Sequence, residues 1–439
     1  MHIILLSGGS GKRLWPLSND IRSKQFIKFF RKEDGEYESM VQRMYRQIRE
    51  VDSKAKVIIA TSKTQVSSIH NQLGGEVSVC VEPCRRDTFP AIALASAYLH
   101  DVEKVPDQEP VVVCPVDPYV ENDYFQAIKR LGEIAAAGEA NLVLMGMVPT
   151  YPSEKYGYVI PVDQEPVSRV ATFREKPDAR TAREYISQGA LWNGGVFAYR
   201  LDYMLKKAHE LIEFEGYEDL FAGYDAIPKI SFDYAVAEKE KRIKVMRFHG
   251  QWKDLGTWNT LTEAMEESCV GKAVLNEKCE NVHVVNELDV PVLCMGLKNM
   301  VVSASPEGIL VSDKVQSSYI KPFVDEIDQQ IMFAEKSWGS FRVLDATEES
   351  LTIKVTLNPG NKMNYHSHER RDEVWNVISG RGRSILDGAE RTLKAGDVVR
   401  MPAGCKHSVI ADTELKIIEI QLGREISVSD KHKYEWPQG

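Results

Sequence analysis

Three glycines and two cations are crowded into one segment near the N-terminus, LSGGSGKRLWPLS, which covers residues 6–18. Glycine has no Cβ, so backbone N–H groups there can approach phosphate oxygens, and the guanidinium of Arg13 adds a charge-assisted fork. The spacing is neither that of GxxxxGK[ST] nor that of GxGxxG. A plain glycine turn explains the glycines, but it does not explain Arg13, Trp15 and Pro16 directly after them. The segment therefore indicates phosphate binding.

Histidines with regular spacing mark a second chemical site near the C-terminus. The pattern is Gly360-x5-His366-x-His368-x4-Glu373-x6-Gly380, followed by Gly396-x5-Pro402-x-Gly404-x2-His407. Side chains alternate along a strand, so His366 and His368 point to the same face. Glu373 and His407 then complete a set of three histidines and one carboxylate. Such a set suits a divalent transition metal, with Zn, Mn, Fe, Co and Ni as the candidates.

Two aspartates stand where phosphate chemistry needs a metal ligand. Asp117 ends the apolar run VVVCPVD, and Asp254 lies in the tryptophan-rich turn QWKDLGTW. Transfer of a phosphoryl-type group requires positioning and charge neutralisation more than a protein nucleophile. Mg²⁺ that bridges phosphates is held by only one or two carboxylates. Taken alone, however, an aspartate at a strand end is more often a helix cap or a turn former.

The elements that must position these residues alternate between strand and helix over the first part of the chain. Short apolar runs predict strands at 2–6, 56–61, 111–115 and 142–147, with helical stretches at 91–100 and 124–137. This alternation predicts an α/β domain with a mainly parallel sheet. Ligands bind at the carboxyl ends of the strands of such sheets, where Ser7-Gly8-Gly9, Asp117 and Gly146 stand.

The pattern changes in the last third of the chain. Short β-branched stretches between about 273 and 327 predict a small β-rich linker with a few coils of β-helix. From Trp338 onward, short alternating strands between glycine-containing turns predict a compact β-barrel. We therefore expect three domains, at 1–268, 269–330 and 331–439.

Composition narrows the class of protein. The net charge of −9 argues against nucleic acid or an anionic membrane surface as the main partner. Seven scattered cysteines without a CxxC pair indicate free thiols in a reducing compartment. The N-terminal apolar run is too short for a signal peptide, and no run of 18 apolar residues occurs elsewhere. A cytoplasmic location is expected.

The glycine segment, together with Lys24-Gln25-Phe26, resembles the signature of the sugar nucleotidyltransferases and, within them, of the mannose-1-phosphate guanylyltransferases. The resemblance implies a Rossmann-like (GT-A-like) domain in which Lys24 neutralises phosphate charge in the transition state. It makes Asp117 and Asp254 the ligands of Mg²⁺. One departure is Ser23, where the family usually has proline. The residues implied to hold the triphosphate are Gly8, Gly9, Ser10, Gly11 and Arg13.

Further short matches follow in the order of that family. The stretch EPCRRDT resembles a base-recognition element, which implies that Glu82, Asp87 and Thr88 bind the nucleotide. Asp87 replaces the usual asparagine, and a carboxylate accepts hydrogen bonds from guanine but cannot donate any. The matches YGY, EKP, WNGGVF and SFDYAVAEK cover the sugar-binding elements. They imply sugar contacts from Gly157, Glu175, Asn193 and Asp233, with Lys176 as a catalytic cation that pairs with the sugar phosphate.

The histidine pattern is the cupin double motif, and it resembles the isomerase half of bifunctional guanylyltransferase/mannose-6-phosphate isomerases. Asn364 and Val374 stand where that family has glutamine and histidine, and the shorter tail has no arginine after Arg424. The metal set is intact, whereas the isomerase-specific set is damaged. Isomerase activity, a barrel used for oligomerisation or stability, and a different sugar-phosphate activity or a sensing site all stay open.

The favoured interpretation is a Mg²⁺-dependent enzyme that transfers GMP from GTP to mannose 1-phosphate, giving GDP-mannose and pyrophosphate. Another nucleotide or sugar 1-phosphate is the alternative, favoured by Asp87 and by Gly194, where the family has serine. A third reading, a protein that only senses sugar phosphates, leaves unexplained why both presumed metal ligands are present. The oligomeric state, with a homodimer as one option, is open.

Overall fold

The computed structural model describes residues 1–9, 12–19, 21–328, 330–427 and 429–436. The chain divides into two compact units. The first comprises Met1–Ser10, Ser23–Val66 and Gly75–Glu266. The second comprises Gly11–Arg22, Ser67–Gly74 and Glu267–Gly439, so two short segments from early in the sequence belong with the C-terminal part.

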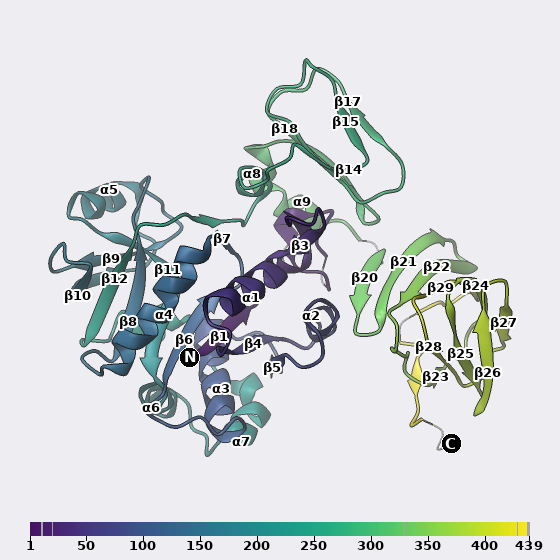
Figure 1. Cartoon of the computed structure of the whole chain (residues 1–439), viewed down its shortest axis with the longest axis horizontal. Coiled ribbons are helices and arrows are strands. Elements are labelled where there is room, and N and C mark those ends of the chain that lie inside the picture. Colours follow the sequence, from purple (N-terminus) through teal and green to yellow (C-terminus); the bar gives the residue numbers. More distant parts are fainter. Residues whose placement is uncertain (10–11, 20, 329, 428, 437–439) are drawn as a thin grey trace. The chain divides into compact units, whose positions relative to one another are not determined.

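A large sheet forms the centre of the first unit (Figure 1). The predicted strands are present as β1 (His2–Ser7), β4 (Lys56–Ser62), β6 (Pro110–Pro115) and β8 (Leu142–Met147). Strands β5 (Ser78–Glu82), β4, β1 and β6 are neighbours and run parallel. Helices cover both faces of parallel sheets, which is why β1, β4 and β6 are almost entirely buried runs of valine, isoleucine and leucine.

The other half of the sheet corrects the expectation of a mainly parallel arrangement. Strand β11 (Leu191–Arg200) lies between β6 and β8 and is antiparallel to both. Beyond β8 come β12 (Ile243–Phe248), β10 (Val167–Arg174) and β9 (Gly157–Pro161), of which β12 is parallel to β8 and β10 is antiparallel to both its neighbours. The sheet is mixed, because an apolar pattern predicts that a strand is buried but not its direction.

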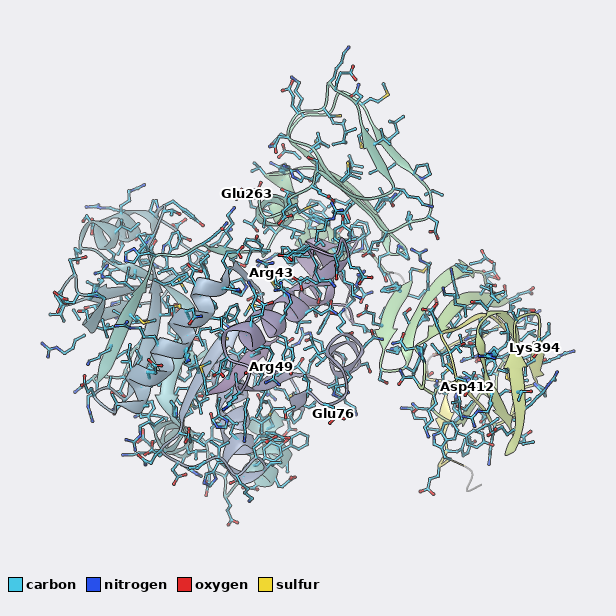
Figure 2. The ribbon with its side chains drawn as sticks, viewed as in Figure 1. Arg43, Arg49, Glu76, Glu263, Lys394 and Asp412 are labelled. Carbon is cyan, nitrogen blue, oxygen red and sulfur yellow. The ribbon has the colours of Figure 1, made fainter. Side chains whose placement is uncertain are left out.

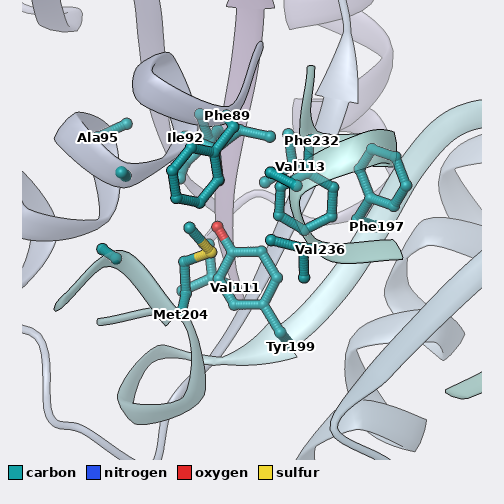
Figure 3. Packing of buried hydrophobic residues seen from close by; sticks show 14 of the residues in the cluster. Phe89, Ile92, Ala95, Val111, Val113, Phe197, Tyr199, Met204, Phe232 and Val236 are labelled. Carbon is teal, nitrogen blue, oxygen red and sulfur yellow. The ribbon is translucent and has the colours of Figure 1, made fainter. Parts of the chain in front are cut away.

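Helix α3 (Thr88–Asp101) includes the predicted helical stretch 91–100, and helix α4 (Asn122–Ala136) covers all but the last residue of the stretch 124–137. Helix α3 is apolar on nearly all sides because it packs between the sheet and helices α6 (Leu201–Leu211) and α7 (Tyr217–Ala222). Figure 3 shows this core, where Phe89 and Ile92 meet side chains from β6 and β11. Further elements are α1 (Met40–Val51), α2 (Val66–Leu73), α5 (Ala179–Ser187), α8 (Trp258–Thr262), β2 (Lys28–Arg31), β3 (Tyr37–Ser39), β7 (Pro118–Val120) and β13 (Trp252–Asp254).

The predicted β-rich linker belongs to the second unit and is built of short stacked strands. Strands β14 (Cys269–Gly271), β16 (His283–Asn286) and β18 (Met300–Ser305) are parallel neighbours, as are β15 (Ala273–Leu275) and β17 (Val292–Cys294). Parallel stacking of such short strands is the arrangement of a β-helix. Strand β19 (Gly308–Asp313) adds an antiparallel edge, and helix α9 (Lys321–Asp325) follows.

The C-terminal part of the second unit is the predicted β-barrel, made of two sheets (Figure 1). Its interior is packed with apolar side chains that include Trp375, Leu393 and Ile417. One sheet has the order β20 (Phe333–Lys336), β21 (Gly339–Ala346), β22 (Ser350–Leu357), β29 (Leu415–Leu422), β24 (Asp372–Ser379), β27 (Val398–Met401). The other has the order β26 (Ala389–Lys394), β25 (Arg381–Leu386), β28 (His407–Ala411), β23 (His366–Ser367), β30 (His432–Lys433).

Charged side chains of both signs lie on the surface, as Figure 2 shows for Arg49 on α1 and for Lys394 and Asp412 in the barrel. Arg43 pairs with Glu121 at 3.1 Å. In the part of the chain that the structure describes, no helix is both long and apolar enough to cross a membrane. The seven cysteines are free thiols, in agreement with their scattered spacing.

Candidate functional site

The first glycine of the glycine segment, Gly8, directly follows β1. Gly9 has φ +101°, a left-handed conformation that favours glycine. A Cβ built on Gly8 or Gly9 meets no heavy atom within 4 Å, so the space beside both residues is open. Ser10 and Gly11, also predicted to bind the nucleotide, lie outside the described residues. Arg13 is exposed in a 3-10 turn of the second unit, where its neighbour Lys12 pairs with Asp325 at 3.1 Å.

Lys24 is the point at which the two predicted metal ligands meet. Its Nζ lies 2.8 Å from Asp117 Oδ2 and 3.8 Å from Asp254 Oδ1. The two aspartates are far apart in the sequence, but the antiparallel pairing of β7 with β13 places Asp254 opposite Pro118, next to Asp117. Both carboxylates are about two-fifths exposed, at 39% and 42%. Both carboxylates therefore lie beside one lysine and are accessible from solvent.

The predicted base-recognition residues have well-defined contacts in the protein. Glu82 accepts a hydrogen bond from the Tyr224 hydroxyl at 2.9 Å, and burial raises its pKa. Asp87 caps helix α3 and accepts from the Thr88 N–H at 2.8 Å. The Thr88 hydroxyl accepts from the Phe232 N–H. Arg85, in the same stretch, donates to the Gly9 carbonyl at 3.4 Å, so the stretch lies beside the glycine segment.

The predicted sugar-binding residues are gathered at one place. Gly157 pairs with Asn193 across β9 and β11, and a Cβ on Gly157 would overlap Glu175 Oε2. That oxygen is buried and has no hydrogen-bond partner among the described residues. Lys176 Nζ lies 2.7 Å from the other oxygen of Glu175. Asn193 donates to Asp233 at 2.7 Å. The five predicted sugar-site residues therefore form one cluster, in which Glu175 Oε2 is available as a hydrogen-bond acceptor.

The electrostatics of this cluster centre on Asp233. Burial, together with the nearby charge of Glu175, raises the pKa of Asp233 to about 6. The Asn193 amide and the Lys176 ammonium oppose the shift. Two carboxylates and one lysine in a partly buried cluster provide acceptors for sugar hydroxyls and a cation for a phosphate.

Sequence reasoning missed an aromatic cavity that Asp254 also lines. The cavity has a volume of about 490 Å³ and is bordered by Tyr151, Tyr156, Trp192 and Trp252. The Tyr156 ring lies 5.0 Å from that of Trp192 and 5.3 Å from that of Trp252. The tryptophans close to Asp254 and Asn193 in the sequence were the available signal, but their spacing does not show that the rings meet.

The three motif histidines of the barrel converge. His366, His368 and His407 are buried, and their ligand atoms lie within 4.8 Å of one another. Nδ1 of His366 lies 2.6 Å from the Asn364 carbonyl, and that of His407 lies 3.0 Å from the Cys405 carbonyl. Nδ1 of His368 contacts the Asp430 carbonyl. Bonds of this kind assign the proton to Nδ1 and turn each Nε2 toward the shared centre, as metal coordination requires.

Glu373 completes the predicted ligand set. The guanidinium of Arg371, which the sequence analysis did not predict, lies beside it. The two oxygens of Glu373 lie 3.1 Å from His368 Nε2 and 3.1 Å from His407 Nε2. Arg371 donates to Glu373 Oε1 at 3.1 Å and lies 3.0 Å from His368 Nε2. The set fits a metal, provided that Arg371 gives up its contact with His368 Nε2.

The barrel interior near the histidines carries further polar groups. Glu419 accepts from the Trp375 indole N–H at 3.1 Å and from Gln421 at 2.6 Å. Burial raises the pKa of Glu419 to about 7, and the charge of Glu373 adds to the shift. Burial of the Lys431 ammonium lowers its pKa, against the charges of Glu419 and Glu373. Alternation along β29, which places Glu419 and Gln421 at interior positions, was the signal for this set.

The tail brings Lys431 to that place. Strand β30 pairs with β23, so that Lys433 lies opposite His366. Asp430 accepts from the backbone N–H groups of Glu369 and Arg370 at 3.0 and 3.1 Å. The tail, which has no arginine after Arg424, therefore returns to the histidines, where Asp430 contacts His368 and Lys433 lies opposite His366.

Comparisons with known proteins agree with this geometry. The chain matches the family model described as nucleotidyl transferase over residues 2–269 and that described as cupin domain over residues 353–421. It is 28% identical to a putative mannose-1-phosphate guanylyltransferase of Vibrio cholerae, covering 98% of this chain and 99% of that protein. It is 27% identical to the mannose-1-phosphate guanylyltransferase of Escherichia coli K12, covering 98% and 97%.

A solved structure from Thermus thermophilus, described as a mannose-1-phosphate geranyltransferase, covers 74% of this chain and 98% of its own. The TM-score is 0.61 and the identity is 28%. The family model spans more than half of the chain and includes Lys24, Asp117, Asp254 and the sugar-site cluster. The chain therefore belongs to the nucleotidyl transferase family.

Proposed function

We propose that this protein transfers GMP from GTP to mannose 1-phosphate, releasing pyrophosphate and forming GDP-mannose. The reaction belongs to the predicted domain 1–268, which the linker 269–330 joins to the barrel domain 331–439. The observation that carries the proposal is the meeting of Lys24 with Asp117 and Asp254 at the carboxyl end of the sheet. The full-length relatives named for this activity support the choice of substrates.

The chemistry follows from the groups at hand. An oxygen of the sugar phosphate attacks the α-phosphorus of GTP, and the bond from that phosphorus to the bridging oxygen of pyrophosphate breaks. No protein nucleophile is needed, so the side chains act by holding the reactants and balancing charge. We propose that Lys24, which lies beside Asp117 and Asp254, faces the phosphates of GTP, and that Lys176, which pairs with Glu175, holds the phosphate of the sugar. Arg13 is proposed to bind the triphosphate as well.

Asp117 and Asp254 are the residues that would hold Mg²⁺. The ion would neutralise phosphate charge and orient the α-phosphate. Two exposed carboxylates with an adjoining lysine match a hard cation that keeps most of its water and phosphate ligands.

Sugar binding is assigned to the cluster around Asp233. Glu175 Oε2, which is buried without a partner among the described residues, is an acceptor for a sugar hydroxyl. Asn193 and Asp233 supply a linked donor and acceptor, and Gly157 leaves the room that Glu175 needs. For the base, the proposed contacts are Glu82, Asp87 and Thr88, with Gly8, Gly9, Ser10 and Gly11 at the phosphates.

A second activity is proposed for the barrel, namely metal-dependent isomerisation of mannose 6-phosphate. The supporting observation is that the buried side chains of Glu373, Glu419 and Arg371 lie close to the histidines, whereas a barrel that serves stability alone has no need of buried ionisable groups. Histidines and a carboxylate suit Zn, Mn, Fe, Co or Ni.

The test of the first activity is pyrophosphate release with each of the four nucleoside triphosphates and a panel of sugar 1-phosphates, at saturating Mg²⁺. We expect the highest kcat/KM for GTP with mannose 1-phosphate. Turnover of only a different pair would contradict the proposed substrates, and no turnover with any pair would contradict the activity. For the barrel, the protein is incubated with mannose 6-phosphate and each divalent ion, and fructose 6-phosphate is measured.

A further inference from the structure

The carbonyl oxygen of Gly9 is held by several donors at the base of the glycine segment. It lies 3.0 Å from Ser23 Oγ, 3.3 Å from Gln65 Nε2 and 3.4 Å from Arg85 Nη2. Ser23 and Gln65 are also joined to each other, with Gln65 Nε2 donating to Ser23 Oγ at 2.7 Å. These contacts all lie within the first unit.

The amide of Gln65 is oriented from its other side. Its Oε1 accepts from Thr61 Oγ1 at 2.9 Å and from Gln25 Nε2 at 3.2 Å, and Gln25 also donates to Ser7 Oγ at 3.1 Å. Each of these five side chains is at most 1% exposed: Ser7, Ser23, Gln25, Thr61 and Gln65. Buried polar groups cost free energy unless their hydrogen bonds are satisfied, so a network of this kind specifies one geometry.

We propose that Gln65 and Ser23 are positioning residues for the triphosphate of the nucleotide. A carbonyl oxygen repels phosphate, and donors from within the protein offset the partial negative charge of the Gly9 oxygen. Ser23 directly precedes Lys24. The same network therefore fixes the position of the Gly9 carbonyl and of the backbone next to Lys24, which contacts Asp117. The inference rests on the proposed function, and it adds two residues that do not contact the reacting atoms themselves.

Ser23 offers a sharp test, because its backbone already has the conformation of proline. Its φ of −72° and ψ of 162° lie close to the values that a proline ring imposes. Ser23→Pro therefore preserves the path of the chain while it removes the hydroxyl. Ser23→Thr keeps the hydroxyl, and Gln65→Met keeps the length of the side chain without its amide.

We expect Ser23→Ala, Ser23→Pro and Gln65→Met each to raise the KM for GTP about tenfold, with the KM for mannose 1-phosphate unchanged. Ser23→Thr should restore most of the affinity for GTP. Because both residues hold one carbonyl, the double variant Ser23→Ala/Gln65→Met should be no worse than the weaker-binding single variant. Ser96→Ala is the matched control, since Ser96 is equally buried and bonds to the Tyr199 hydroxyl away from the site.

The dissociation constant of GTP, measured by calorimetry with Mg²⁺, separates this inference from the proposed function. If wild-type protein binds GTP but does not turn over mannose 1-phosphate, the proposed reaction fails, while weaker GTP binding in the variants still supports the network. GTP binding that is equal in wild type and in the Ser23 and Gln65 variants overturns the positioning role. The same result follows if Ser96→Ala weakens GTP binding as much as Ser23→Ala does.

Discussion

The transferase site and the barrel site both bring carboxylates together with nitrogen groups, but they do so in opposite surroundings. Asp117 and Asp254 are about two-fifths exposed and lie beside Lys24, which already balances part of their charge. His366, His368, His407 and Glu373 are all at most 4% exposed. A metal held by two exposed carboxylates exchanges readily and can arrive with its substrate, whereas buried histidines with fixed tautomers suit a resident ion.

This difference explains why the two sites use different residues. Carboxylates that are open to solvent beside a lysine would be accessible to a hydrated cation. Neutral histidines can be buried at less cost than charged groups, and burial lowers the pKa of His366 to about 2, which keeps it unprotonated. Under the proposed function, exposed carboxylates would hold the metal that arrives with the nucleotide, and buried histidines would hold a resident metal in the barrel.

The largest effect is expected when Asp117 or Asp254 is removed from the transferase site. Asp117→Ala and Asp254→Ala should each lower kcat for pyrophosphate release about a thousandfold or more, because each variant loses a ligand for the charge-neutralising ion. The fold should persist, as shown by an unchanged circular dichroism spectrum. Asp225→Ala is the control, since Asp225 is exposed on the same unit and outside the site. Near-normal rates in both variants would remove the metal assignment.

Removal of a histidine from the barrel site should leave the transferase activity unchanged. His407→Ala is expected to reduce the content of bound transition metal from about one ion per chain to background, because the remaining ligands are too few. Pyrophosphate release with excess Mg²⁺ should stay within about twofold of wild type, since the ligands of the two sites are separate sets. Elemental analysis by mass spectrometry measures the metal. Retention of the metal, or a parallel loss of transferase activity, would contradict two independent sites.

A smaller effect is expected where the sugar cluster depends on the absence of a side chain. Gly157→Ala places a methyl group against Glu175 Oε2, so the KM for mannose 1-phosphate should rise about 10- to 100-fold. The KM for GTP should change little. Gly75→Ala serves as the control, because a Cβ there meets no heavy atom within 4 Å. An equal rise for both substrates would argue for general damage rather than a sugar contact.

The smallest effect is expected from protonation of Asp233 in the sugar-site cluster. With a pKa of about 6, Asp233 is ionised at pH 7 and loses its charge as the pH falls. We expect the KM for mannose 1-phosphate to rise about tenfold between pH 7 and pH 5, because a protonated acid accepts hydrogen bonds less well. Asp233→Asn should abolish this dependence. A pH profile that is the same in wild type and variant would refute the role of Asp233.

The raised pKa of Asp233 also makes the free energy of unfolding depend on pH. The raised pKa means that the folded state holds the proton of Asp233 more tightly than the unfolded state, where the pKa is about 3.9. Its stabilising contribution is therefore complete below about pH 4 and is lost as the pH rises through 6. Unfolding measured in urea at pH 4 and pH 7 should show a smaller difference in Asp233→Asn than in wild type.

Local patterns in the sequence were enough to predict the order of elements and to select the residues of the two proposed sites. The apolar runs of β1, β4, β6 and β8 and the helical stretches within α3 and α4 lie where predicted, because burial imposes its period on each segment separately. The motif spacing also identified His366, His368, Glu373 and His407, since strand alternation acts over only a few residues. The family and the transferase activity followed from matches in order along the chain.

Only the tertiary structure decided how distant segments meet. The antiparallel direction of β11, the contact of Arg371 with His368, the return of Lys431 to the barrel and the bonding of Ser23 and Gln65 to Gly9 all depend on packing between elements. Sequence determined which side chains were available, because residue type and local spacing set their chemistry. Tertiary structure decided which of them share one point in space, because long-range contacts are specified jointly by the whole core rather than by any one segment.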